Sequence, residues 1–131
     1  MILPCEIAVK SVIPAIRATI AKELVEIYGL KQDQVAEILG VSQSAVSKYT
    51  RQVRGHVIKI DKTEGLQPHM NNMTKLLVNG SLERTESLGL FCQTCMMIRK
   101  SGLMCRFCQR ADPKIKLEDC SFCLNYKTTP K

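Results

Sequence analysis

Apolar residues recur at helical spacing in the first part of the chain. Ile16, Ile20 and Leu24 fall four positions apart, with polar residues between them. This spacing places them on one side of a helix, so we expect an amphipathic helix from about Ile13 to Tyr28. A shorter helix is expected before it, over residues 5–12.

Two shorter helices are expected next, with a tight turn between them. The pattern favours one helix over residues 31–39 and another from 43 to about 54, with Ser42 as its N-cap. Gly40 suits a left-handed turn position. Ala36 is small where the two helices must approach. These features together predict a helix-turn-helix.

The pattern is weaker farther along. Residues 57–60 fit a short strand or an extended linker, and further helices are expected over 66–79 and 81–88. The helix over 66–79 carries an apolar stripe, which either forms a dimer contact or a link to the Cys-rich module, or packs inside one subunit. Its members are Leu66, Met70, Met73, Leu76 and Leu77.

We therefore expect a mainly α protein: an N-terminal helix-turn-helix bundle, a helical linker and a small Cys-rich module that binds a metal or a cluster. The expected division is 1–60 for the helix-turn-helix domain, 61–90 for the linker or dimerisation segment, 91–126 for the Cys-rich module and 127–131 for a tail.

The charge of the chain adds a candidate partner. Its formal net charge is +7, which favours a polyanion. The segment from residue 43 to 59 contains basic residues and no acidic one. The alternative for this segment is an ordinary solvated helix of a bundle. If this segment is a recognition helix, its outward polar residues would contact base edges. These residues are Ser42, Gln43, Ser44, Ser47 and Lys48. Phosphates would be held by Gln32, Arg51 and Arg54.

The segments 3–10, 21–24 and 34–47 resemble the N-terminal domain of predicted archaeal transcriptional regulators with an Xre-like (repressor-type) helix-turn-helix. The most specific part is Leu-Gly-Val-Ser-Gln at 39–43. The chain is most similar to short members with C-terminal CxxC pairs. This resemblance implies a homodimeric regulator of double-stranded DNA. Recognition helices about 34 Å apart would then face an inverted-repeat operator.

Six of the seven cysteines form three CxxC pairs near the C-terminus. Two thiolates at this spacing can converge on one metal, so a thiolate-bound centre is expected rather than free buried cysteines. The candidate ligands are Cys92, Cys95, Cys105, Cys108, Cys120 and Cys123. The seventh, Cys5, is expected to be a small core residue.

The identity of the centre is less constrained, because ligand spacing alone does not select the metal. We favour a four-iron or two-iron iron–sulfur cluster, with Zn²⁺ as the alternative. Glycine is missing after each pair, and Phe91, Phe107 and Phe122 would supply an apolar shell. The surplus pair could form a redox couple, bridge two subunits or complete a second centre. Basic residues near the pairs could offset the negative charge of the thiolates, or they could be solvated residues or phosphate contacts. These residues are Arg99, Lys100, Arg106 and Arg110.

The expected function is a sequence-specific transcription regulator whose cluster senses redox state, oxygen or iron. The alternatives are the same regulator with structural zinc, and a zinc-stabilised adaptor of the transcription machinery. An enzyme is not expected, because the sequence lacks a phosphate-binding glycine loop and a paired acid and base. Charged residues and prolines interrupt the opening segment, so neither an export signal nor a membrane span is expected, and we predict a cytoplasmic location.

Overall fold

The computed structural model describes residues 1–51, 58–60, 63, 65–118 and 120–125, and within these residues it contains helices and no strand. This confirms the expected mainly α class. In chain order the helices are α1 (Pro4–Lys10), α2 (Val12–Glu26), α3 (Gln32–Leu39), α4 (Gln43–Thr50), α5 (Leu66–Asn79), α6 (Arg84–Lys100), α7 (Cys105–Ala111) and α8 (Phe122–Asn125).

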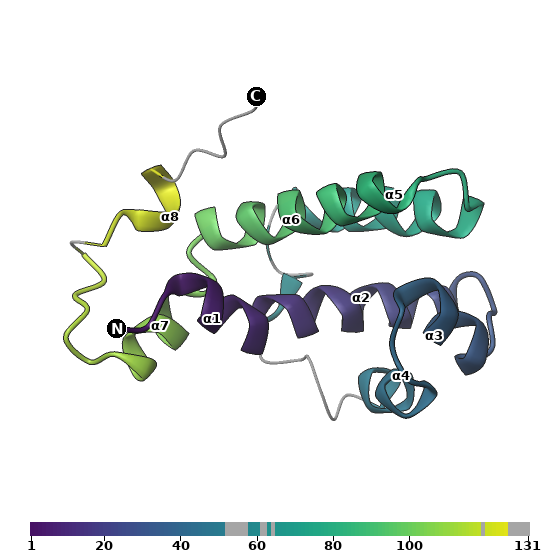
Figure 1. The fold of residues 1–131 in the computed structure, drawn as a ribbon, viewed down its shortest axis with the longest axis horizontal. Helices are drawn as coiled ribbons and strands as arrows, with labels where there is room; N and C mark the ends of the chain where they lie inside the picture. Colours follow the sequence, from purple (N-terminus) through teal and green to yellow (C-terminus); the bar gives the residue numbers. More distant parts are fainter. Residues whose placement is uncertain (52–57, 61–62, 64, 119, 126–131) are drawn as a thin grey trace.

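Helix α2 lies at the centre of the molecule and contacts α1, α3, α4, α5 and α6 (Figure 1). Its large apolar side chains Ile16, Ile20 and Leu24 are completely buried. The alanines of α2 are buried as well, and their small side chains let neighbouring helices approach. A helix that is covered on several sides needs apolar residues around most of its circumference, as α2 has.

Helix α5 packs on α2 through its apolar stripe. Leu66, Met70 and Met73 are buried within the chain, whereas Leu76 and Leu77 are half-buried. Of the two alternatives for this stripe, internal packing therefore accounts for its first three members. Burial of these side chains stabilises the contact of α5 with α2 and α6.

Polar contacts reinforce the same helix pair. Glu23 of α2 is buried, and its Oε2 accepts a hydrogen bond from the Thr74 hydroxyl of α5. Its Oε1 accepts a second bond from Nε2 of Gln67, at 2.9 Å. Both carboxylate oxygens are thus satisfied inside the protein, as a buried charged group requires.

The helix expected over residues 81–88 is longer and starts later. Helix α6 begins at Arg84 after its N-cap Glu83 and continues to Lys100. Glu86 Oε1 accepts the backbone N–H of Glu83 at 3.1 Å, which fixes this start. The helix continues because Thr94, Cys95 and Ile98 are buried along it.

The connection between α4 and α5 is described only in part. Ile58 and Ile60 are buried, but neither belongs to a strand, so the strand alternative is wrong at these two residues. Val57 lies outside the described residues. Both isoleucines belong to the same core as the helices.

One hydrophobic cluster joins α1, α2, α3 and α4 to α5 and α6. Residue 91, the expected start of the Cys-rich module, lies inside α6. The division of the chain at residues 61 and 91 stays a prediction. Among the described helices, none has the length and apolar character needed to cross a membrane.

Candidate nucleic-acid interface and cysteine cluster

The connection between α3 and α4 is a tight, well-capped turn. Gly40 follows the end of α3 with a φ of 67°, a left-handed conformation in which other residues are strained. Ser42 then caps α4, and its Oγ accepts a hydrogen bond from the backbone N–H of Ala45 at 3.0 Å. The local sequence therefore sets the angle between the two helices.

Apolar contacts hold α4 against the rest of the domain. It packs on both α2 and α3. Val35 of α3 and Val46 of α4 are fully buried, and Tyr49 is almost fully buried. Ala36 of α3 is buried as well, at the position where its small size was expected to let the two helices approach. Because this face of α4 is fixed, its opposite face is held in a defined orientation toward solvent.

The predicted base-reading residues lie at the start and along the outer side of α4. Ser42, Gln43 and Ser44 are exposed, whereas Ser47 and Lys48 are half-buried. Exposed polar groups at the start of a recognition helix are the ones that reach base edges in this type of domain.

The predicted phosphate contacts are spread over two helices. Arg51 follows the end of α4 and is exposed, with its Nε donating to the Ser47 carbonyl at 3.4 Å. Gln32 is the first residue of α3 and is half-buried. Arg54 lies outside the described residues.

A capped pair of short helices packed on a third helix, with a polar outer face, defines a DNA-binding helix-turn-helix domain. A family model described as Helix-turn-helix matches residues 22–55, which span the end of α2, α3 and α4. The comparisons with curated proteins and with solved structures found no match to this chain.

The family match confirms the expected Xre-like helix-turn-helix and supports a DNA-binding transcription regulator. It concerns a DNA-binding domain and not an enzyme, which is consistent with the expectation of no catalytic activity.

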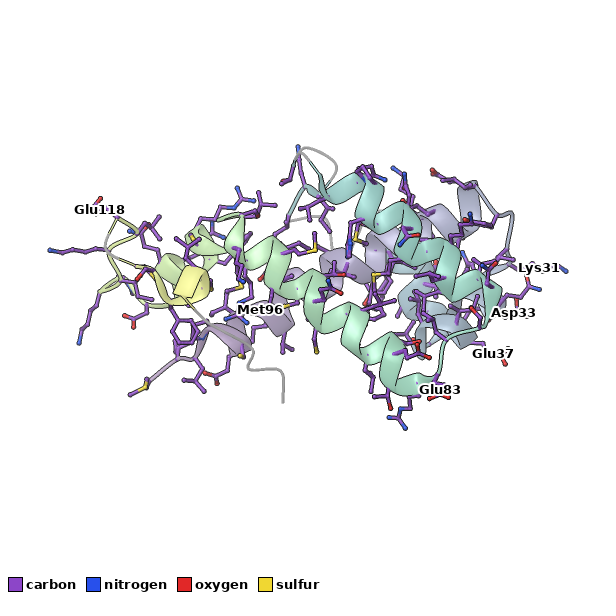
Figure 2. The ribbon with its side chains drawn as sticks, turned by 90° about the horizontal axis from the view of Figure 1, so that it is seen from above. Lys31, Asp33, Glu37, Glu83, Met96 and Glu118 are labelled. Carbon is purple, nitrogen blue, oxygen red and sulfur yellow. The ribbon has the colours of Figure 1, made fainter. Side chains whose placement is uncertain are left out.

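The cysteine-rich segment lies at the opposite end of the molecule from α3 and α4. Figure 2 shows Lys31, Asp33 and Glu37 at the α3 end, Glu118 at the far end and Met96 of α6 between them. Helix α7 contacts α1, and α8 contacts α6. An influence of the cysteines on α4 would therefore have to pass through the central helices.

The three cysteine pairs have different surroundings. Cys92 and Cys95 both lie within α6, the first exposed and the second buried. The other two pairs lie at the starts of short helices. Cys105 and Cys108 of α7 are half-buried, as is Cys123 of α8, while Cys120 before α8 is exposed.

The four cysteines of the last two pairs line one cavity of about 300 Å³. Arg99 of α6 and Pro4 of α1 also line it, together with apolar side chains that include Ile115 and Leu124. Cys92 and Cys95 do not line this cavity. The fold thus distinguishes the first cysteine pair from the other two, although all three have the same spacing in the sequence.

Arg99 is the charged residue most closely associated with the cysteines. It is only 5% exposed. Its Nε lies 3.4 Å from Sγ of Cys123, and its NH1 lies 3.9 Å from Sγ of Cys5. Its NH2 is buried without a hydrogen-bond partner among the described residues. Burial lowers the pKa of Arg99, but Cys123 and Cys5 outweigh this effect and raise the pKa overall.

One expectation at this site was wrong. Cys5 is exposed on α1 and not a core residue. Among the four basic residues considered, Arg99 is buried, whereas Lys100, Arg106 and Arg110 are exposed. The sequence signalled only the association of Arg99 with Cys95, because residues four positions apart lie on one face of a helix. Its association with Cys5 and Cys123 had no such signal.

Burial favours the neutral thiol at three positions. Burial raises the pKa of Cys95, although Arg99 opposes this change. It also raises the pKa of Cys105 and Cys108, with a further increase from the charge of Cys123. Among the described residues, no three His, Cys, Asp or Glu are arranged to hold a metal ion.

Proposed function

We propose that this chain is a transcription regulator that binds a specific double-stranded DNA site through α4. The observation that carries this proposal is the capped turn at Gly40 and Ser42, which presents an exposed polar first turn of α4 inside the segment matched by the helix-turn-helix model. Such a turn fixes the angle at which a recognition helix enters the major groove.

The residues of α4 divide by role according to their position. Gln43, Ser44, Ser47 and Lys48 read base edges, and Ser42 lies beside them at the helix start. Arg51, Arg54 and Gln32 hold phosphates and so fix the register of the domain on the duplex. This division is supported by the exposure of Gln43, Ser44 and Arg51.

The regulator acts as a homodimer on an inverted-repeat operator. A single short recognition helix reads only a few base pairs, so two copies are needed for a specific site. With a twofold axis between them, the two α4 helices meet half-sites about 34 Å apart. The protein acts in the cytoplasm, where its cysteines stay reduced.

The cysteine-rich segment binds a thiolate-ligated centre that regulates DNA binding. An iron–sulfur cluster would make the protein a sensor of redox state, oxygen or iron, because gain or loss of the cluster changes the packing of α7 and α8. Zinc would instead stabilise the fold. The contacts of α7 with α1 and of α8 with α6 support a route from this segment to the DNA-binding domain.

Selection of binding sites from random DNA with the full chain tests the proposal. We expect enrichment of an inverted repeat, followed by a footprint centred on its axis. If no sequence is enriched, the proposed regulator is wrong, and a zinc-stabilised adaptor of the transcription machinery becomes the better description.

Variants of α4 separate base reading from phosphate contact. Gln43→Ala should weaken binding to the selected site by about 1–3 kcal/mol and relax base preference at one position. Arg51→Ala should weaken binding to all sequences and reduce the salt-dependence slope by about one. Lys75→Ala, which removes an exposed charge from α5, is the matched control. Equal effects of Lys75→Ala and Arg51→Ala would contradict the assignment.

A further inference from the structure

We propose that one thiolate-bound metal centre is held by four of the six paired cysteines: Cys105, Cys108, Cys120 and Cys123. Arg99 is the buried cation that balances the charge of this centre and positions it against α1. This inference rests on the proposed thiolate-ligated centre and states which residues build it.

The first argument is spatial. These four cysteines line one cavity of about 300 Å³, formed where α6, α7 and α8 meet the start of α1. A water molecule occupies about 30 Å³ of liquid, so the cavity has room for a zinc ion or for a larger cluster. Its remaining lining is mainly apolar, which limits the access of solvent to a bound centre.

The second argument comes from a shared motif. Residues 105–108 and 120–123 both read Cys-x-Phe-Cys, whereas residues 92–95 read Cys-Gln-Thr-Cys. Each segment also lies near the start of a short helix, since α7 begins at Cys105 and α8 begins at Phe122, two residues after Cys120. Equivalent segments of this kind can each supply two thiolates to one tetrahedral ion or to one cluster.

The third argument excludes the first pair. Cys92 and Cys95 lie in the second half of α6, a continuous helix of 17 residues. Cys95 is buried in the hydrophobic core, and Cys92 is exposed to solvent. Bringing both sulfurs to one ion would require removal of Cys95 from the core. The first pair is therefore the surplus pair.

The fourth argument is electrostatic. Arg99 is buried, and no carboxylate contacts it among the described residues. Its polar neighbours there are cysteine sulfurs, those of Cys123, Cys5 and Cys95. Its NH2 has no hydrogen-bond partner there either. A buried guanidinium is costly unless an anion balances it. Four thiolates around a divalent ion, or around a cluster, carry a net negative charge and would supply that anion.

Binding of the metal also organises the site. The described cysteines surround the cavity, but no three of them are arranged to hold an ion. The four sulfurs must therefore come closer together when metal binds. Such coupling of metal binding to local folding is usual for small thiolate sites.

Metal analysis of the full chain, purified without oxygen, tests the ligand set. We expect Cys105→Ser, Cys108→Ser, Cys120→Ser and Cys123→Ser each to lower bound metal per chain by about tenfold or more, whereas Cys92→Ser retains it. Iron with acid-labile sulfide would identify a cluster, and zinc without sulfide would identify a single ion. Either result supports the four-cysteine site.

Alkylation of the unmutated protein gives a test that does not depend on the folding of variants. Bound thiolates should be protected, so mass spectrometry should find the four proposed ligands unmodified and Cys92 modified. Protection of Cys92, with modification of Cys120 and Cys123, would overturn the choice of these four ligands but not the proposed metal centre. A chain that binds neither iron nor zinc would overturn the proposed centre itself, while leaving the test of DNA binding untouched.

The role of Arg99 has a separate measurement. Competition with a chromophoric chelator gives the Zn²⁺ affinity of the full chain. Arg99→Met should weaken it by about tenfold, within the range for residues that surround metal ligands, and Arg99→Lys should restore most of it. Lys100→Met, which removes the neighbouring exposed charge, should leave it unchanged. Equal affinities for Arg99→Met and the unmutated chain would refute the charge-balancing role.

Discussion

Glu23 shows how a single buried residue connects two helices that are distant in the sequence. Its two carboxylate oxygens accept hydrogen bonds from Thr74 and Gln67 of α5, while Glu23 itself belongs to α2. Helical spacing alone does not predict a buried carboxylate at this position. Satisfied buried polar groups of this kind specify one packing arrangement, because any other would leave them without partners.

Replacement of Thr74 tests this contact. Thr74→Val keeps the shape of the side chain but removes the hydroxyl donor, which leaves Oε2 of Glu23 buried and unsatisfied. We expect the free energy of unfolding to fall by about 1–3 kcal/mol, measured by urea denaturation. Lys75→Ala changes an exposed residue of the same helix that takes no part in these hydrogen bonds, and it is the control. Equal stability of Thr74→Val and the unmutated chain would show that this contact contributes little.

At the scale of elements, the turn between α3 and α4 is the part of the molecule that local sequence controls most directly. Gly40 has a positive φ, and Ser42 caps the following helix. Neither feature depends on distant residues. This independence explains why the segment 39–43 was recognisable from its sequence, and why the family match extends over the same helices.

A pair of glycine substitutions separates backbone strain from helix propensity. A Cβ at Gly40 would meet no neighbouring atom, but its φ of 67° disfavours any other residue. Gly40→Ala should therefore destabilise the protein by about 1 kcal/mol. Gly89 lies within α6, is exposed and has no atom near its Cβ position, so Gly89→Ala should stabilise by about 0.5–1 kcal/mol.

Thermal unfolding of both variants provides the measurement. Opposite shifts of the melting temperature are expected for the two substitutions. A stabilising effect of Gly40→Ala would mean that the left-handed turn does not constrain the connection between α3 and α4.

At the scale of the whole molecule, the candidate DNA-binding end and the cysteine-lined cavity are separated by the length of the central helices (Figures 1 and 2). Both ends nevertheless belong to one packed structure, because α2 contacts α4 on one side and α6 on another. Stabilisation of the cysteine end should therefore be measurable in the unfolding of the entire chain.

Removal of the proposed metal tests this connection. A ligand that binds only the folded state stabilises it by about 2.7 kcal/mol at a free concentration of about 100 times its dissociation constant. We expect a chelator to lower the midpoint of urea unfolding, followed by helical circular dichroism. Addition of zinc, or reconstitution of the cluster, should restore the midpoint. Cys120→Ser should show no response to either treatment.

The local pattern was sufficient for α2, α3 and α5, whose ends agree with the sequence to within about two residues. Helix α4 begins where expected but ends at Thr50, whereas the sequence predicted an end near residue 54. The local pattern was insufficient for α6, because the Cys-x-x-Cys pair at 92–95 favoured a metal-binding turn or helix start over a continuous helix, although Phe91, Cys95 and Ile98 have helical spacing. The second half of α6 depends on its contact with α2, which only the folded chain provides.

The sequence by itself determined the helical class, the capped turn before α4 and the presence of three cysteine pairs, because each depends on neighbouring residues. Only the tertiary structure decided that four cysteines share a cavity, that Cys95 is buried away from it and that Arg99 lies beside Cys5 and Cys123. Cys5 and Arg99 are 94 positions apart. The physical reason is that burial and charge compensation arise between distant segments, and spacing along the chain does not record them.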